Sequence, residues 1–409
     1  MNPPAWTRAL RAYREGRLAA ALASRLRPWV RGARWMLARP AAPGISLHAP
    51  DYVRPDPGER GAVERIFVAF QKMKKDQGHA PACYAPSPLW QAQLEEAFAD
   101  LVGGLRDNDL ERFHFFLANF GAWKTYHGLE SSTFVQACAR SALKRRYMEQ
   151  DVFRRQLDIW TWFYNGRKPR TCLSYPTHGN QSGAYVDGVF VGVGSFFNEI
   201  YGSLLAGLIA DLPRPVVAEL GAGYGKLAYF VLRDLPRATF IDFDLPETLC
   251  VAAYYLTRAF PHRRSLLYGE GEYGPELHRE YDLIFMPGYE ISKVGAFTVD
   301  LFINKNSLGE MTREAVESYV AWIARATRGH FFHMNHDGRP VPFAQGECGL
   351  LGHQYPVPMD QFRLLFRYPD LGHMVYEGAL DLRKDIFLYL YERRGPTAAG
   401  PGPQAGGDP

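Results

Sequence analysis

A glycine-rich turn that closes a short apolar segment constrains the fold of this chain more than any other feature. The segment, residues 215–218, is followed by Glu219 and then by three glycines at alternate positions, Gly221, Gly223 and Gly225. Glycine permits a tight turn and leaves bare backbone against which a ligand can lie. Turns that bind dinucleotides place their third glycine one residue later, where this chain has Lys226. The spacing favours a ligand-binding strand, turn and helix without the dinucleotide pattern, although an ordinary strand-to-helix connection is the alternative.

The acid before the turn narrows the choice of ligand. A carboxylate at Glu219 would repel a pyrophosphate but would favour the amino group and sulfonium of S-adenosylmethionine. A second apolar segment, residues 238–243, delivers Asp244 at a distance where the next strand of a doubly wound sheet presents an acid to ribose hydroxyls. Asp244 also suits the N-cap of a helix that begins near Pro246. The pair predicts an S-adenosylmethionine site, with capping as a compatible second role.

Three further stretches resemble one enzyme family. They are the loop 179–183, the segment 244–256, and the segment 299–311 with its Asn304-Lys-Asn306-Ser307 run. Over roughly residues 170 to 340 the chain resembles the sugar O-methyltransferases, a branch of the class I S-adenosylmethionine-dependent methyltransferases. The chain departs from the family pattern at Gln181 and Gly309, which affects the acceptor side rather than the cofactor side.

The resemblance and the apolar segments together predict the architecture. We expect an α/β, Rossmann-like class I methyltransferase with a mostly parallel seven-stranded sheet, plus an N-terminal helical domain. Residues 282–287 and 299–303 are expected as the third and fourth strands, with Pro287 and Asn304 at the cofactor, and 330–334 as the fifth. The runs 362–366 and 386–391 are expected to form the final antiparallel pair, and Asp187-Gly188 a hairpin turn.

The predicted domain boundaries follow changes in composition. They are a basic arm at 1–45, a helical domain at 46–168, a hairpin plus methyltransferase domain at 169–394, and a disordered tail at 395–409. The first 39 residues hold nine arginines, and Leu18, Leu22 and Leu26 would line one side of a helix. Such an arm could contact an anionic membrane or a glycan-assembly enzyme, or could be a disordered or surface-packed segment.

Composition and charge limit the classes of protein to which the chain could belong. The net charge of +4 is small for 409 residues and does not suggest a nucleic-acid partner. No apolar run reaches the length of a membrane span, and arginines interrupt any secretory signal at the start of the chain. The five cysteines are dispersed, which argues for a reducing compartment and against a structural zinc site. We therefore expect a cytoplasmic enzyme without a metal, with membrane-peripheral attachment through the arm as an alternative.

The acceptor should lie beyond the end of the fourth strand, since ligands of doubly wound sheets bind at the carboxyl ends of the strands. Glu310 is a candidate general base if burial raises its pKa, and Asn306 and Ser307 are candidates for binding sugar hydroxyls. The structural alternative is a capping box in which Ser307 caps a helix and Glu310 closes it.

Histidines supply the other candidates. His178 lies in a glycine-flanked loop with Asn180 and is the second candidate base, although a loop histidine can also be merely exposed. His333 and Asn335 lie at the end of the fifth strand and are expected to contact the acceptor. The spacing of His333 and His336 does not match a metal motif.

These residues predict methyl transfer from S-adenosylmethionine to a sugar hydroxyl, in a polysaccharide or a glycosylated metabolite. The sugar is implied by the family resemblance alone. Alternatives are methylation of a non-sugar small molecule, such as a phenol, and an inactive cofactor-binding scaffold in glycan assembly.

Overall fold

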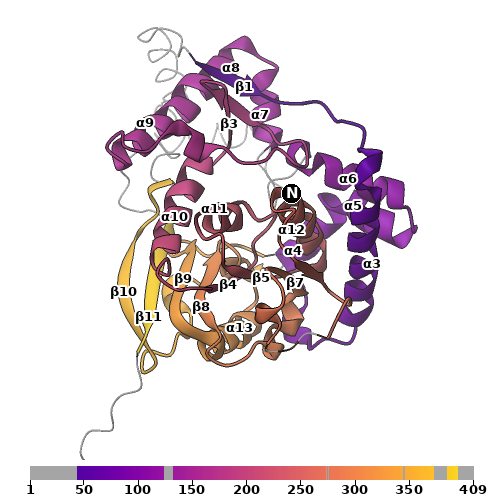
Figure 1. The fold of residues 1–409 in the computed structure, drawn as a ribbon, viewed down its shortest axis with the longest axis vertical. Helices are drawn as coiled ribbons and strands as arrows, with labels where there is room; N and C mark the ends of the chain where they lie inside the picture. The colour runs from indigo at the N-terminus through magenta and orange to yellow at the C-terminus, as the bar shows by residue number, and fades with distance from the viewer. Residues whose placement is uncertain are drawn as a thin grey trace, which may run out of the picture.

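The computed structural model describes residues 44–123, 132–272, 274, 276–343, 346–372 and 385–394. Nearly all of the predicted basic arm and the whole of the predicted tail lie outside these residues. Figure 1 shows a central twisted sheet with helices on both sides and a largely helical N-terminal region beside it.

The central sheet has eight strands in the order β10-β11-β9-β8-β4-β5-β7-β6. In chain order they are β4 (Val216–Leu220), β5 (Thr239–Asp244), β6 (Ser265–Leu267), β7 (Leu283–Pro287), β8 (Val299–Lys305), β9 (Thr327–His336), β10 (Phe362–Pro369) and β11 (Ile386–Arg393). Only β11 runs against the other strands of this sheet. The order from β7 to β10 with one reversed strand is the predicted class I methyltransferase arrangement. The edge strand β6 is an eighth strand that the sequence did not predict, because its three residues are too few to show a period.

Both faces of the sheet are covered, which explains why its central strands are almost continuously apolar. One face, which includes Val217 and Phe240, packs on α10 (Ser195–Gly207), α11 (Lys226–Asp234) and α12 (Pro246–Ala259). The other face, which includes Ala218 and Ile241, packs on α13 (Arg313–Ala326). Alternate residues of each strand therefore feed two separate cores, and the carboxyl ends of the parallel strands meet at one edge.

The N-terminal region is largely helical, as predicted for residues 46–168. Its helices are α3 (Arg60–Gln77), α4 (Pro88–Glu96), α5 (Ala99–Arg106), α6 (Leu110–Asn119), α7 (Ser132–Ala139), α8 (Ala142–Tyr147), a π-helix (Met148–Phe153) and α9 (Arg154–Phe163). Helix α3 packs along α12, and buried residues such as Phe70 and Tyr255 belong to one continuous hydrophobic core. The helical region therefore shares its core with the central sheet.

A small antiparallel sheet joins this region to the central sheet. Strands β2 (Gly183–Val186) and β3 (Val189–Gly192) form the predicted hairpin, and β1 (Ile45–His48) pairs with β2. Asp187 and Gly188 have φ angles of 49° and 81°, as a two-residue hairpin turn requires. Helix α10 follows, with Gly194 at its N-cap and no capping hydrogen bond from a side chain.

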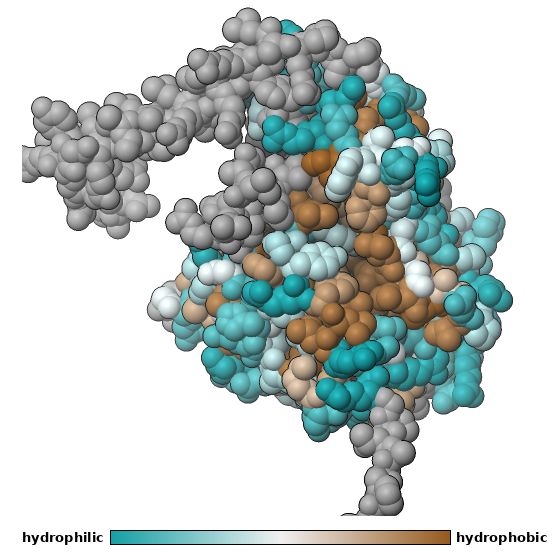
Figure 2. All heavy atoms as spheres, turned by 90° about the vertical axis from the view of Figure 1, so that its left-hand side faces the viewer, coloured by the Kyte–Doolittle hydropathy of each residue, from teal (hydrophilic) through white to brown (hydrophobic). Residues whose placement is uncertain are grey.

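The outer edge of the central sheet is the side seen in Figure 2, where hydrophobic side chains lie among hydrophilic ones. Leu364 and Leu365 of β10 are 38% and 40% exposed on this edge strand. Among the described residues, no helix combines the length and the apolar character needed to cross a bilayer.

Candidate cofactor and acceptor site

The glycine turn lies where the sequence predicted it, between β4 and α11. Gly221, Gly223 and Gly225 have φ angles of 77°, 62° and 90°, a region that side chains disfavour. A Cβ atom added at Gly221 would lie 2.3 Å from the Oγ atom of Ser307. The turn therefore packs directly against the end of β8, and both backbone conformation and space require glycine there.

Two buried carboxylates lie side by side behind this turn. Glu219 of β4 and Asp242 of β5 are opposite each other in the parallel register and are 2% and 0% exposed. Both oxygens of Asp242 and the Oε2 atom of Glu219 are buried without a hydrogen-bond partner of normal geometry among the described residues, although the backbone N–H of Ala222 has a small opposing effect on the pKa of Asp242. Burial raises the pKa of Glu219 to about 8 against the opposing effect of the Lys305 charge, and burial with the nearby Asp244 and Glu219 charges raises the pKa of Asp242 well above its usual value.

Asp242 was missed by the sequence analysis. It looked like part of an apolar strand, and the only available signal was that an acid in such a strand must be buried. Burial of a carboxylate without a partner is costly, so the pair marks a place where positive charge would be favoured.

Asp244 ends β5 and connects the glycine turn to α12. Its Oδ2 atom accepts a hydrogen bond from the backbone N–H of Gly223 at 3.1 Å, and its Oδ1 atom accepts one from Leu245 at 2.7 Å. The N-cap of α12 is Leu245, so the alternative that Asp244 is the cap is wrong. Burial raises its pKa to about 6, with an opposing effect of the hydrogen bonds it accepts. Pro287 ends β7 directly beside it in the parallel register.

Asn304, at the end of β8, is fully buried and fully hydrogen-bonded. Its amide group donates to the carbonyl of Leu220 at 2.8 Å and to Ser307, and its oxygen accepts from Leu308 and from Asn335. The Oγ atom of Ser307 also donates to Leu220, at 2.9 Å. This network ties the end of β8 to the end of β4. Direct cofactor contact by Asn304 stays a prediction, as does sugar binding by Ser307.

Asn335 of β9 extends the same network. It is also fully buried, and its oxygen accepts a hydrogen bond from the backbone N–H of Gly309 at 3.1 Å. The loop that carries Glu310 is therefore held by amides on two strands. Within that loop Asn306 has a φ of 61°, and its buried side-chain oxygen has no partner among the described residues. Asn306 thus offers an unused acceptor atom beside the loop.

Glu310 occupies a different environment from the one that a capping box would give. Its carboxylate accepts a hydrogen bond from the indole N–H of Trp90, in α4, at 2.9 Å. Ser307 makes no capping hydrogen bond, and α13 begins after Thr312, whose hydroxyl caps it. The capping-box alternative is therefore wrong. Burial, with a contribution from the Asp244 charge, raises the pKa of Glu310 to about 7, which is the shift that a general base near neutrality needs.

His178 lies on the helical side of the site. Its Nδ1 atom accepts a 3.4 Å hydrogen bond from Arg258 of α12, and burial followed by the Arg258 charge lowers its pKa. Its loop packs against residues 120–122, and Asn180 donates to the carbonyl of Asp51 and to Asn119. The amide of Asn180 therefore holds the loop in place, and its contact with an acceptor stays a prediction.

His333 is fully buried within a stack of aromatic rings. Its ring lies 4.4 Å from that of Tyr389 and 5.0 Å from that of Tyr355, measured between centroids. Both ring nitrogens lack hydrogen-bond partners among the described residues, and burial lowers its pKa to about 3. His336, three residues later, pairs with Asp385 instead. The part of the chain that the structure describes contains no cluster of three metal-binding side chains.

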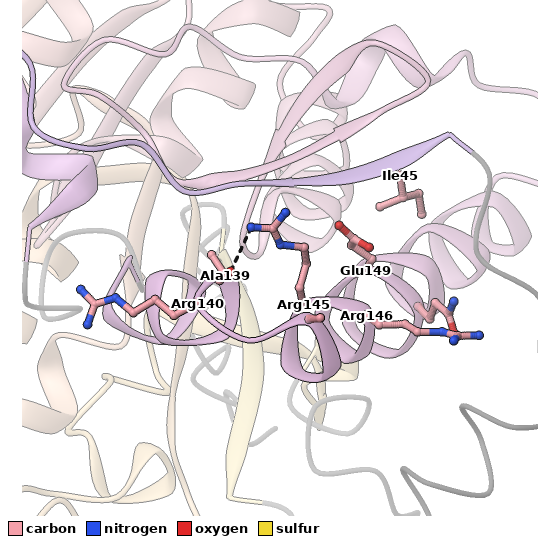
Figure 3. A pocket seen from close by; sticks show the side chains of 8 residues that line it. Ile45, Ala139, Arg140, Arg145, Arg146 and Glu149 are labelled. Atoms are coloured by element: carbon pink, nitrogen blue, oxygen red, sulfur yellow. Dashed lines mark hydrogen bonds between the residues drawn. The ribbon is translucent and has the colours of Figure 1, made fainter.

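A separate hollow of about 590 Å³ lies near α7 and α8, away from these strand ends. Arg140, Arg145, Arg146 and Glu149 are among its lining residues. Figure 3 shows Arg140 and Arg146 extending to opposite sides, while Arg145 donates to the carbonyl of Ala139. Glu149, whose carboxylate accepts from the backbone of Leu47, points into the same space. The guanidinium groups do not converge on one point, so the hollow is not a built anion site.

Comparisons with solved structures find methyltransferases of several substrate classes. The chain is similar to a mitomycin 7-O-methyltransferase at 15% identity, over 49% of this chain and 57% of that one, with a TM-score of 0.29. It is similar to magnesium protoporphyrin IX methyltransferase from Synechocystis PCC 6803 with bound SAM, at 13% identity over 48% and 80% of the two chains, with a TM-score of 0.31.

A third similar structure is geranyl diphosphate C-methyltransferase from Streptomyces coelicolor A3(2) with S-adenosyl-L-homocysteine. Its identity is 11% over 47% of this chain and 79% of that one, and the TM-score is 0.33. No protein-family model and no curated protein sequence matches the chain. The fold assignment rests on the strand order of the central sheet.

Proposed function

We propose that the protein is an S-adenosylmethionine-dependent O-methyltransferase that methylates a sugar hydroxyl. One observation carries the proposal: the glycine turn lies directly against two buried carboxylates, Glu219 and Asp242, that lack sufficient hydrogen-bond partners. A ligand with positive charge and no phosphate would relieve the unfavourable burial of these groups. S-adenosylmethionine has both properties, whereas the pyrophosphate of a dinucleotide would be repelled.

The described residues fit this cofactor along the strand ends. Glu219 and Asp242 would face its positive charge, Gly221 to Gly225 would give it bare backbone, and Asp244 would accept from its ribose hydroxyls. Pro287, next to Asp244 in register, would contact the cofactor. When bound, the cofactor supplies a methyl group on a sulfonium, which is already a good electrophile.

The protein's own task is to hold the acceptor oxygen in line and to take its proton. Alignment can supply as much as about 7 to 11 kcal/mol of the barrier, and a positioned base about 10² to 10⁴-fold in rate. Glu310 is our choice of base, because its pKa of about 7 makes it both substantially ionised and basic near neutrality. His178 is the weaker candidate, because its Nδ1 atom already accepts from Arg258.

The sugar class is supported by the family resemblance of residues 170 to 340 and by the unused oxygen of Asn306 near Glu310.

We further propose a cytoplasmic enzyme whose arginine-rich arm attaches it to an anionic membrane or to a glycan-assembly enzyme. Deletion of residues 1–39 should then abolish binding to anionic vesicles and leave turnover of a soluble acceptor intact, since each arginine near such a surface contributes about 1 kcal/mol. Equal vesicle binding by both forms would contradict membrane attachment.

The decisive experiment is transfer of a labelled methyl group. The protein is incubated with methyl-labelled S-adenosylmethionine and with glycan fractions or small-molecule pools, and the label is located by mass spectrometry. Label on a sugar oxygen supports the proposal, and label on a phenol supports a non-sugar acceptor. Tight cofactor binding without transfer to any pool would indicate an inactive scaffold.

A further inference from the structure

The segment between β9 and β10 covers the ends of β8 and β9 and brings a tyrosine close to Glu310. Tyr355 follows a short 3-10 helix, Gly352–Gln354, and is only 7% exposed. Its hydroxyl oxygen is buried and has no hydrogen-bond partner among the described residues. Leaving a buried hydroxyl unpaired costs about 1 to 3 kcal/mol. Such a group in a native fold calls for a reason, and a ligand that completes its bonding is one.

The position of this hydroxyl connects it to the acceptor side of the site. A Cβ atom added at Gly309 would lie 3.5 Å from the Tyr355 oxygen and 3.6 Å from the side-chain oxygen of Asn335. The phenol therefore lies beside the residue that immediately precedes Glu310.

The protonation state of Tyr355 fixes its hydrogen-bonding role. Burial, followed by the charges of Asp337, Tyr389 and Glu310, raises the pKa of its hydroxyl well above the usual value. The phenol therefore keeps its proton at any physiological pH and can donate a hydrogen bond. Asn306, in the loop before Glu310, has a side-chain oxygen that can only accept.

We infer that Tyr355 is an acceptor-binding residue, whose hydroxyl donates a hydrogen bond to an oxygen of the sugar while Glu310 receives the proton of the methylated hydroxyl. This inference rests on the proposed function. A donor at Tyr355 and an acceptor atom at Asn306 suit an acceptor molecule that carries more than one hydroxyl, since each hydroxyl can both donate and accept.

The test compares Tyr355→Phe with Tyr389→Phe. The Tyr389 hydroxyl donates to Asp337 at 2.8 Å, so its removal breaks a buried hydrogen bond and should lower the melting temperature. Tyr355→Phe removes an unpaired hydroxyl, so the melting temperature and S-adenosylmethionine affinity should be unchanged or higher. Its kcat/KM for the sugar acceptor should fall about tenfold, mainly through a higher KM, which is the effect expected from the loss of one neutral hydrogen bond.

Two results would overturn the inference while leaving the proposed function intact. One is wild-type kcat/KM in Tyr355→Phe with an active sugar acceptor. The other is a fall in melting temperature as large as that of Tyr389→Phe, which would show a structural partner for the Tyr355 hydroxyl. Failure of the wild-type protein to methylate any sugar is a different result, because it removes the proposed function and the inference together.

Discussion

The site has two halves at the same edge of the sheet, one at the ends of β4 and β5 and one at the ends of β8 and β9, and their buried polar side chains differ in hydrogen bonding. At the ends of β4 and β5, Glu219 and Asp242 are buried as acids without enough partners. At the ends of β8 and β9, Asn304 and Asn335 are equally buried but bond to each other and to the backbone of neighbouring strands. The difference indicates that the first half is completed by a charged ligand, whereas the second is a rigid frame for the loop that carries Glu310.

The largest expected effect is the loss of turnover when Glu310, in the loop held by this frame, is replaced. Glu310→Gln keeps an oxygen for the indole of Trp90 but cannot take a proton, so turnover should fall about 10² to 10⁴-fold with cofactor affinity nearly unchanged. The wild-type rate should rise with pH through about 7, the pKa to which burial raises Glu310. Steady-state kinetics across pH would measure both effects. Glu314→Gln, at an exposed position in the first turn of α13, is the control and should be neutral. A loss smaller than tenfold in Glu310→Gln would exclude it as the base.

Removal of a charge from the first half should lower the affinity for the cofactor rather than the stability of the fold. Glu219→Gln should lower S-adenosylmethionine affinity about 10 to 150-fold, the equivalent of about 1.5 to 3 kcal/mol for an interaction with a charged group. The cofactor-free variant should be at least as stable as the wild type at pH 8, since it no longer ionises a buried group. Calorimetric titration and thermal unfolding would separate the two effects. A destabilised variant with normal affinity would assign Glu219 to the fold.

Removal of an amide from the second half should show the reverse pattern. Asn304→Ala removes one of the two side-chain donors to the buried carbonyl of Leu220 and takes away the oxygen to which the amide of Asn335 donates, so the free energy of unfolding should fall about 1 to 3 kcal/mol. Chemical denaturation would measure it. Asn306→Gly is the matched control, because its side-chain oxygen has no described partner and glycine tolerates the positive φ. Equal destabilisation by both changes would contradict the rigid frame.

The sequence predicted those features that depend on local pattern. The strand segments and the glycine turn follow from apolar runs and spacing, and the sheet arrangement from these together with the family resemblance. The sequence named Glu310 as a base only on the condition that burial raises its pKa. The environment of Glu310 did not follow, because Trp90 reaches it from 220 residues earlier in the chain. Asp242 lies in an apolar strand segment, where the sequence does not show that it is buried beside Glu219. Ser307 and Glu310 have the spacing of a capping box, but local spacing cannot show that tertiary contacts engage both side chains. Tyr355 lies in a segment without periodicity, where only the fold places it near the site.

The stability of the cofactor-free protein and its affinity for the cofactor should both depend on pH through Glu219. The cofactor-free protein holds the Glu219 proton up to about pH 8, whereas the unfolded chain releases it near the usual value of 4.5. The folded state binds more protons in that window, so its free energy of unfolding should fall as pH rises from 4.5 to 8. A cation bound at the carboxylates favours their ionised forms, so cofactor affinity should rise over the same range.

The central claim, that unpartnered buried carboxylates receive the positive charge of the cofactor, is tested most directly by counting protons. S-adenosylmethionine is titrated calorimetrically at pH 7 in buffers of different ionisation enthalpy, with wild type and with Glu219→Gln. The account predicts release of about one proton or more by the wild type, and about one fewer by the variant. Binding without proton release, or with the same release in both proteins, would contradict it.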